Sequence, residues 1–182
     1  MSHIGLTKWR YGLAPLLAVL LSGCGLAQRT SEGTAATMKA IFYKKITTLH
    51  LDITAREALN TDASENSHIS APVMVRVYQL KDRKAFDLAL YQQLVKDDNE
   101  ALKGELLSQH DVVLKPGADE ALNLPMDPDA KFVAVAAFFR QPDLTKQSWR
   151  LVIDREALDP DNARIVEASD NRLRLLPVKG KS

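Results

Sequence analysis

The segment TTLHLDIT, residues 47–54, decides the fold class because apolar and polar residues alternate along it. Its apolar residues are Leu49, Leu51 and Ile53, and one polar residue stands between each of them. Successive side chains of a β-strand point to opposite faces of the sheet, so this spacing predicts a strand with one buried and one solvated face. A strand of this kind belongs to a sheet that covers a core on one side.

Seven further segments carry strand signals. Residues 73–80 are rich in β-branched side chains, and residues 131–140 are apolar on both faces, as expected for a strand in the centre of a sandwich. The other predicted strands are residues 106–114, 120–126, 148–154, 164–169 and 172–178. Short strands separated by turn residues predict a mainly β fold, a two-sheet antiparallel β-sandwich of about eight strands.

One segment, residues 82–103, has a helical period instead. Its apolar residues spaced four apart are Phe86, Leu90 and Leu94. This spacing places side chains on one face of a helix, which Asp82 can cap at its start. Residues 97–99, Asp-Asp-Asn, are expected to interrupt it. We therefore predict a helical insertion that packs its apolar face on a sheet.

The N-terminus has the layout of a secretory signal peptide. Residues 1–10 are basic, residues 13–21 are apolar, and small residues directly precede Cys24, the only cysteine of the chain. The apolar run is too short to cross a bilayer, which takes about 20 residues. The sequence Leu-Ser-Gly-Cys at residues 21–24 resembles the bacterial lipoprotein box, in which the cysteine thiol is acylated and becomes the new N-terminus after cleavage.

We accordingly predict three parts: a lipoprotein signal peptide over residues 1–23, a flexible tether over residues 24–37 and a folded domain over residues 38–182. The tether is small and polar. Two or more acyl chains on Cys24 would hold the protein stably in a membrane. Gly25, where an Asp would resemble an inner-membrane retention signal, favours the outer membrane, with the domain at its periplasmic face. The alternative is an unmodified Cys24 near an ordinary cleavage site.

Charge and motif content argue against several function classes. The chain carries 24 Lys and Arg and 23 Asp and Glu, and the signal peptide holds two of the basic residues, so the mature chain is close to neutral. It therefore has no basic field for nucleic acid. Phosphate-loop, dinucleotide and nucleophile-elbow motifs are absent, and the four histidines lack metal-ligand spacing. We expect no catalytic residue, no metal, no small-molecule substrate and no cofactor beyond a covalent lipid on Cys24.

The polar connection between the first two strands, residues 59–70, is the strongest candidate for a recognition surface. It is longer than a usual hairpin connection of about two to five residues. Long loops on rigid sandwiches often carry binding residues. A solvated loop with no binding role is the alternative, and the residues themselves favour neither.

Several segments together resemble a known family. These are the lipobox at Cys24, VRVYQL at 75–80, AFDLALYQQLVKDD at 85–98, VAVAAFFR at 133–140 and WRL at 149–151. The combination resembles the TssJ (SciN-like) outer-membrane lipoproteins of the bacterial type VI secretion system. The resemblance covers nearly the whole mature chain.

This resemblance implies a transthyretin-like β-sandwich with an added helical segment and a non-enzymatic role. Such lipoproteins tether the trans-envelope secretion complex to the outer membrane by binding the periplasmic C-terminal domain of TssM, which forms the membrane complex with TssL. In the family the loop between the first two strands helps to make that contact. The corresponding exposed candidates in this chain are Asn60, Thr61, Asp62, Glu65, Asn66 and His68. The loop at residues 141–147 is a second candidate.

Two other functions remain open from the sequence. The first is a periplasmic ligand carrier or an envelope-maintenance lipoprotein on the same fold, and a lipoprotein hydrolase comes third. A carrier or an enzyme is expected to show a deep apolar pocket with converging polar groups. An adaptor is expected to show a filled core and an exposed, ordered loop.

Overall fold

The computed structural model describes residues 37–38, 40–41, 45–62 and 69–177. The chain divides into two units, Met1–Ile41 and Phe42–Ser182, and the described residues of the first unit have helical backbone. The signal peptide, Cys24 and the tether up to residue 36 lie outside the described residues, as do Glu65, Asn66 and His68. Within the described part of the chain, no helix is both long and apolar enough to cross a membrane.

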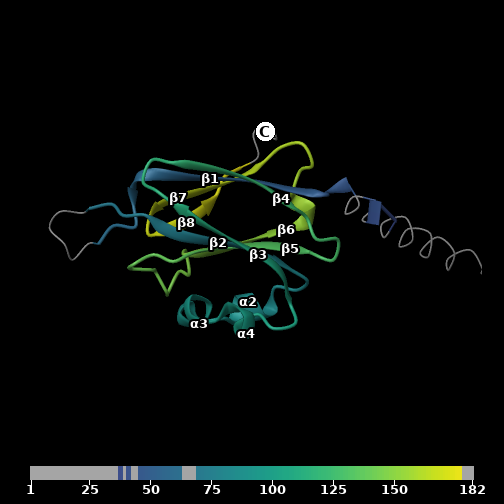
Figure 1. Cartoon of the computed structure of the whole chain (residues 1–182), viewed down its shortest axis with the longest axis horizontal. Helices are drawn as coiled ribbons and strands as arrows, with labels where there is room; N and C mark the ends of the chain where they lie inside the picture. The colour runs from purple at the N-terminus through teal and green to yellow at the C-terminus, as the bar shows by residue number, and fades with distance from the viewer. Residues whose placement is uncertain (1–36, 39, 42–44, 63–68, 178–182) are drawn as a thin grey trace, which may run out of the picture. The chain divides into compact units, whose positions relative to one another are not determined.

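Eight strands form two four-stranded sheets, which lie face to face (Figure 1). The first sheet has the order β4 (Asp119–Pro125), β1 (Thr48–Leu59), β7 (Arg164–Asp170) and β8 (Arg172–Leu175). The second has the order β3 (Leu106–Leu114), β2 (Val73–Leu80), β5 (Phe132–Ala137) and β6 (Arg150–Asp154). The predicted mainly β sandwich is confirmed, with each predicted strand in place.

One strand pair departs from the purely antiparallel arrangement. β1 and β7 run parallel, with Leu51 opposite Arg164 and Ala55 opposite Ala168, and the register shifts before Leu59. Parallel neighbours need a crossover connection. The chain provides it because β4 and all four strands of the second sheet come between β1 and β7 in the sequence. The other five pairs are antiparallel.

The core lies between the sheets and is built from alternate residues of their central strands. The inward-facing residues, each no more than 2% exposed, are Leu49, Leu51 and Ile53 of β1 and Val73, Val75 and Val77 of β2. The two-residue period read from the sequence therefore identifies the buried face of both strands correctly.

Three short helices cover the outer face of the second sheet (Figure 1). They are α2 (Lys84–Leu88), α3 (Tyr91–Lys96) and α4 (Asp98–Ala101). Phe86 of α2 packs edge-on against Tyr78 of β2, with ring centroids 5.7 Å apart. This layer explains why β5 is buried on both faces. A short 3₁₀ helix, η1 (Arg155–Ala157), follows β6.

The helical layer is held to the sheet by a largely buried ionic network. Arg76 of β2 donates from Nη1 to Asp98 of α4 at 2.6 Å and from Nε to Asp111 of β3 at 2.5 Å. The side chains of Arg76 and Asp98 are only 13% and 7% exposed. Such a pair is costly to break because a lone buried charge would remain.

The prediction that Phe86, Leu90 and Leu94 share one helix face is wrong for Leu90. Phe86 and Leu94 are fully buried, whereas Leu90 is 67% exposed. The backbone is extended at Ala89 and Leu90, with ψ angles of 135° and 151°, so the helical period stops there. The N-cap residue of α2 is Arg83, which makes no side-chain capping hydrogen bond; the predicted Asp82 stands one residue earlier, where its Oδ1 accepts from the Lys84 N–H at 3.1 Å.

Candidate partner-binding surface

The β1–β2 and β5–β6 connections meet at one end of the sandwich. Asn60 Oδ1 accepts the backbone N–H of Arg140 at 2.7 Å, and the Arg140 guanidinium donates to the carbonyls of Asn60 at 3.0 Å and Ile69 at 3.2 Å. The side chain of Gln141 donates to the carboxylate of Asp62. The two candidate loops, about 80 residues apart in the chain, therefore form one surface.

The β7–β8 turn joins the same end. Asn171 Nδ2 donates to the carbonyl of Thr61 at 2.9 Å, and the carbonyl of Asp170 accepts the N–H of Asn60. We call this combined feature the loop surface and define it as residues 60–62, 69–70, 140–147 and 171. Three separate connections contribute to it, so its described parts are fixed by contacts between elements as well as within them.

Asn60 itself is not an exposed contact residue, which corrects the sequence-based expectation. It is 3% exposed and has a φ of 51°, a left-handed conformation that Asn tolerates better than most residues. Its Nδ2 donates to the carbonyl of Pro72 at 2.9 Å. Asn60 therefore joins the β1–β2 connection to the β5–β6 connection through its hydrogen bonds with Arg140. Thr61 and Asp62 are partly exposed and remain available at the surface.

The base of the β1–β2 connection is closed by a second set of bonds. Ser70 Oγ donates to the carbonyl of Glu57 at 2.6 Å and accepts the N–H of Leu59 at 3.3 Å. The N–H of Ala71 donates to the carbonyl of Leu59 at 3.0 Å. Both ends of the connection are thus pinned, which lowers the ordering cost when a partner binds.

Two exposed apolar side chains of the loop surface were not singled out from the sequence. Ile69 is 60% exposed and Leu144 is 59% exposed. Leu144 stands in a turn in which Asp143 Oδ1 accepts the N–H groups of Thr145 at 3.1 Å and Lys146 at 2.9 Å. A single apolar residue inside the polar run QPDLTKQ was the available sequence signal. Apolar side chains in the middle of a polar surface are typical anchors of protein interfaces.

The β5–β6 connection is also tied to the helical layer. The Tyr91 hydroxyl donates to the carbonyl of Phe139 at 2.6 Å, and its ring packs edge-on against Trp149 at 5.0 Å. Burial raises the pKa of the Tyr91 phenol to about 12. Tyr91 of α3 therefore contacts residues on both sides of the 140–147 turn, Phe139 before it and Trp149 after it.

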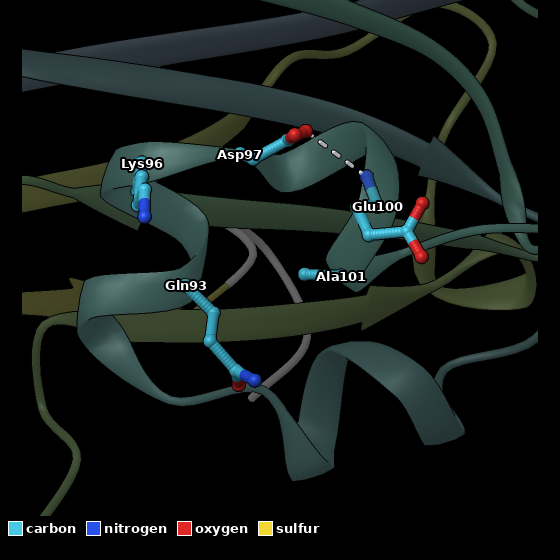
Figure 2. A pocket seen from close by; sticks show the side chains of 5 residues that line it. All are labelled: Gln93, Lys96, Asp97, Glu100 and Ala101. Atoms are coloured by element: carbon cyan, nitrogen blue, oxygen red, sulfur yellow. Dashed lines mark hydrogen bonds between the residues drawn. The ribbon is translucent and has the colours of Figure 1, made fainter.

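Two hollows lie on the described surface, and the larger of the two is polar. One of about 500 Å³ lies between α3 and α4 (Figure 2) and is lined by Gln93, Lys96, Asp97, Glu100 and Ala101. Another of about 170 Å³ lies beside Arg83 and Arg150. Charged and amide side chains prevail in the first, whereas ligand pockets are mainly apolar. Among the residues that the structure describes, no cluster of His, Cys, Asp and Glu is arranged to hold a metal ion.

Comparison with known proteins identifies relatives. The model of the type VI secretion lipoprotein family (VasD, EvfM, TssJ) matches residues 47–174. A chain from a structure described as a type VI membrane complex is 52% identical, with a TM-score of 0.68, and covers 72% of this chain and 99% of its own length. A chain from a structure described as the TssM C-terminal domain from EAEC is 49% identical, with a TM-score of 0.66, over 73% and 100%.

A more distant structure has the same fold. The type VI lipoprotein TssJ1 from Pseudomonas aeruginosa is 24% identical, with a TM-score of 0.60, and covers 72% of this chain and 95% of its own length. No curated protein matches the chain. The family match begins one residue before β1 and ends within β8. The chain belongs to the TssJ family of type VI secretion lipoproteins.

Proposed function

We propose that this chain is a non-enzymatic lipoprotein, acylated on Cys24, that anchors the type VI secretion complex to the periplasmic face of the outer membrane. It does so by binding the periplasmic C-terminal domain of TssM, within the membrane complex that includes TssL, through the loop surface together with residues 63–68 of the β1–β2 connection. The observation that carries this proposal is the convergence of the β1–β2 and β5–β6 connections, joined by Arg140 and Asn60. Relatives about half identical come from structures described by TssM and by a type VI membrane complex.

The position of the loop surface suits such a task. β1 begins at Thr48 and runs for 12 residues to Leu59, where the loop surface starts (Figure 1). At about 3.3 Å per residue, the 11 steps from Thr48 to Leu59 span roughly 36 Å. The chain therefore enters the sandwich at one end of β1, and the proposed contact lies at the other end of this strand.

Contacts within the loop surface also favour partner binding. Pinned connections lose little conformational freedom on association, so a small interface can bind tightly through a few anchors. The acyl chains confine the protein to the membrane region and so raise its effective concentration near a membrane-spanning partner. A sandwich with a filled core, a polar loop surface and a lipid anchor on Cys24 are together sufficient for an adaptor.

Replacing residues 63–68 by a Gly-Ser segment of the same length tests the proposal. This change retains Asn60 and Ser70, so the base of the connection stays closed. We expect the variant to lose binding to the purified TssM periplasmic domain in a calorimetric titration, with an unchanged thermal midpoint. The matched control is Asp129→Lys, an exposed residue at the other end of the sandwich, which should bind as the wild type does. Undiminished affinity of the loop variant would refute the assignment.

A further inference from the structure

The junction between α2 and α3 presents two leucines to solvent. Leu88 is 81% exposed and Leu90 is 67% exposed, although Phe86 and Leu94 on either side are fully buried. A continuous helix would have placed Leu90 on the same face as Phe86 and Leu94. The extended backbone at Ala89 and Leu90 separates the two helices and leaves both leucines outside.

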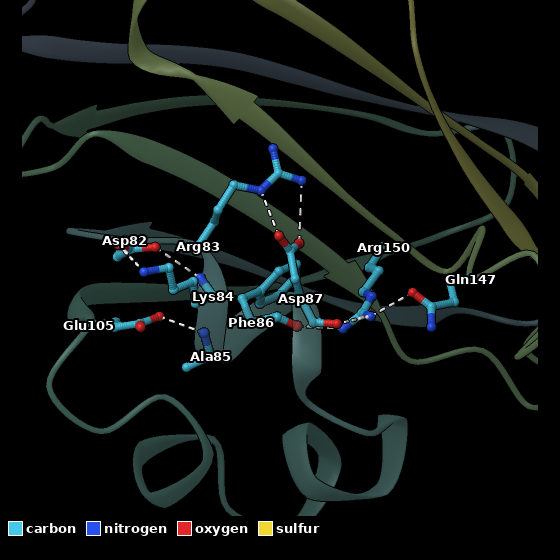
Figure 3. Close-up of polar contacts among 9 residues, drawn as sticks. All are labelled: Asp82, Arg83, Lys84, Ala85, Phe86, Asp87, Glu105, Gln147 and Arg150. Carbon is cyan, nitrogen blue, oxygen red and sulfur yellow. Dashed lines mark hydrogen bonds and ion pairs between the residues drawn. The ribbon is translucent and has the colours of Figure 1, made fainter.

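The junction is held in this form by a side chain from the sheet beneath it. Arg150 of β6 donates from Nη1 to the carbonyl of Phe86 and from Nη2 to that of Asp87 at 2.7 Å (Figure 3). Its Nη1 also donates to the carbonyl of Ala89 at 3.0 Å. On the α3 side, Gln93 Oε1 accepts the N–H of Leu90 at 2.8 Å. The leucines therefore lie on a fixed backbone, and their exposure does not come from a frayed helix end.

The junction is continuous with the loop surface. Arg150 Nη2 also donates to Gln147 Oε1 at 2.6 Å, so the residue that fixes the junction contacts the last residue of the 140–147 turn (Figure 3). Tyr91, the first residue of α3, bonds to Phe139 at the other end of that turn. The turn thus lies between the β1–β2 connection, which it reaches through Gln141 and Asp62, and the α2–α3 junction.

Charge around the junction argues against a lipid surface as the occupant. The helical segment and its flanks carry the basic residues Lys81, Arg83, Lys84, Lys96 and Lys103. They also carry the acidic residues Asp82, Asp87, Asp97, Asp98, Glu100 and Glu105. Surfaces that bind anionic membranes have a clear basic excess, which is absent here. Continuity with the loop surface instead favours the same protein partner.

We infer that the partner-binding surface extends from the β1–β2 connection across the 140–147 turn to the α2–α3 junction, where Leu88 and Leu90 insert into an apolar depression of the partner. This inference rests on the proposed function. Leu144, exposed on the intervening turn, is a third apolar anchor. The polar loop gives specificity, and the leucines contribute the buried apolar area.

The test is a titration of the TssM periplasmic domain with the mature chain carrying Cys24→Ser, which keeps the protein soluble. The variant Leu88→Ser/Leu90→Ser is expected to bind at least tenfold more weakly, as removal of interface anchors does. Its thermal midpoint should stay unchanged because both side chains are exposed in the free protein. The matched control is Val113→Ser, also exposed, on the edge strand opposite to β6, which should bind as the wild type does.

The outcomes separate this inference from the proposed function. Weaker binding of the leucine variant, with Val113→Ser unaffected, supports the extended surface. Wild-type affinity of the leucine variant would overturn the extension if the Gly-Ser replacement of residues 63–68 still abolishes binding, and the proposed function would stand. The extension is equally overturned if the leucine variant keeps its affinity for TssM but loses binding to phosphatidylethanolamine–phosphatidylglycerol vesicles. If neither variant weakens binding, both ideas fail.

Discussion

At the scale of single residues, three arginines hold the connections of this sandwich by donating hydrogen bonds to backbone carbonyls. Arg140 donates to carbonyls of the β1–β2 connection, and Arg150 donates to carbonyls of the α2–α3 junction. Arg155 donates to the carbonyls of Ile46 at 2.9 Å and Ala130 at 2.7 Å, among others. A guanidinium has five N–H donors in a rigid plane, so one side chain can satisfy several carbonyls that no strand pairs.

Replacement of Arg155 should be the most damaging of the three for stability, because it is only 2% exposed. Arg155→Met would remove the guanidinium donors to carbonyls of the β4–β5 turn and of Ile46. We expect a loss of about 3 kcal/mol in the free energy of unfolding, measured by urea denaturation. Arg155→Lys should recover only part of it, since an ammonium lacks the planar set of donors.

The matched control is Arg174→Met on β8, where the side chain is exposed. It should change stability by less than about 0.5 kcal/mol, as surface substitutions usually do. An equal effect of the two Met substitutions would show that loss of charge, rather than loss of the carbonyl contacts, matters at Arg155.

These residue-scale contacts could not be predicted from the sequence. The sequence places Arg140 and Arg150 in predicted strands, and nothing near them in the chain identifies the backbone carbonyls that they contact. The carbonyls that accept from Arg140 lie about 70 to 80 residues away, and those that accept from Arg150 about 60. Asn60 was misjudged for the same reason: a polar residue in a loop is usually exposed, and its burial depends on a distant strand end.

At the scale of elements, predictions succeeded where the pattern is local. Alternation in β1 and β2 identified the buried face because a two-residue period needs no information from elsewhere. The helical segment gave the correct layer and the correct burial of Phe86 and Leu94, but not the break at Ala89. That break is stabilised by Arg150, which lies about 60 residues further along the chain, so a local period could not reveal it.

The attachment of α3 to the β5–β6 connection should make stability sensitive to alkaline pH. Burial raises the pKa of Tyr91 to about 12, above its ordinary value of about 10 in the unfolded chain. The unfolded state therefore releases this proton first as pH rises. The free energy of unfolding should be unaffected below about pH 10 and should fall between about pH 10 and 12.

Tyr91→Phe tests this dependence by urea denaturation at pH 7, 10 and 11.5. At pH 7 the variant should be less stable, because the bond to the Phe139 carbonyl is lost. Its further loss above pH 10 should be smaller than that of the wild type. Some loss should remain, since burial also raises the pKa of Tyr78. Parallel curves for the two proteins would contradict the role given to Tyr91.

At the scale of the whole molecule, the topology assembles the loop surface. The two candidate loops can be identified from the sequence, but their contact cannot. This contact requires β1 and β5, which belong to different sheets, to end at the same end of the sandwich. The parallel β1–β7 pair adds the β7–β8 turn to that end. Lipidation of Cys24 stays a prediction from the sequence, since this residue lies outside the described part of the chain.

The position of the loop surface at the end of β1, away from the start of this strand, leads to a prediction for Cys24→Ser. If the thiol carries the lipid, labelled palmitate should enter the wild type and not the variant. Because β1 spaces the loop surface about 36 Å from the start of the sandwich, the purified variant should bind the TssM periplasmic domain with the affinity of a wild-type domain lacking its acyl chains. In cells, secretion through the type VI system should nevertheless fall, because the unanchored protein loses its effective concentration at the membrane and the complex loses its attachment.

Equal labelling of both proteins would contradict acylation of Cys24. A weaker solution affinity of the variant would instead show that the N-terminal region takes part in the contact, contrary to the separation of the two ends.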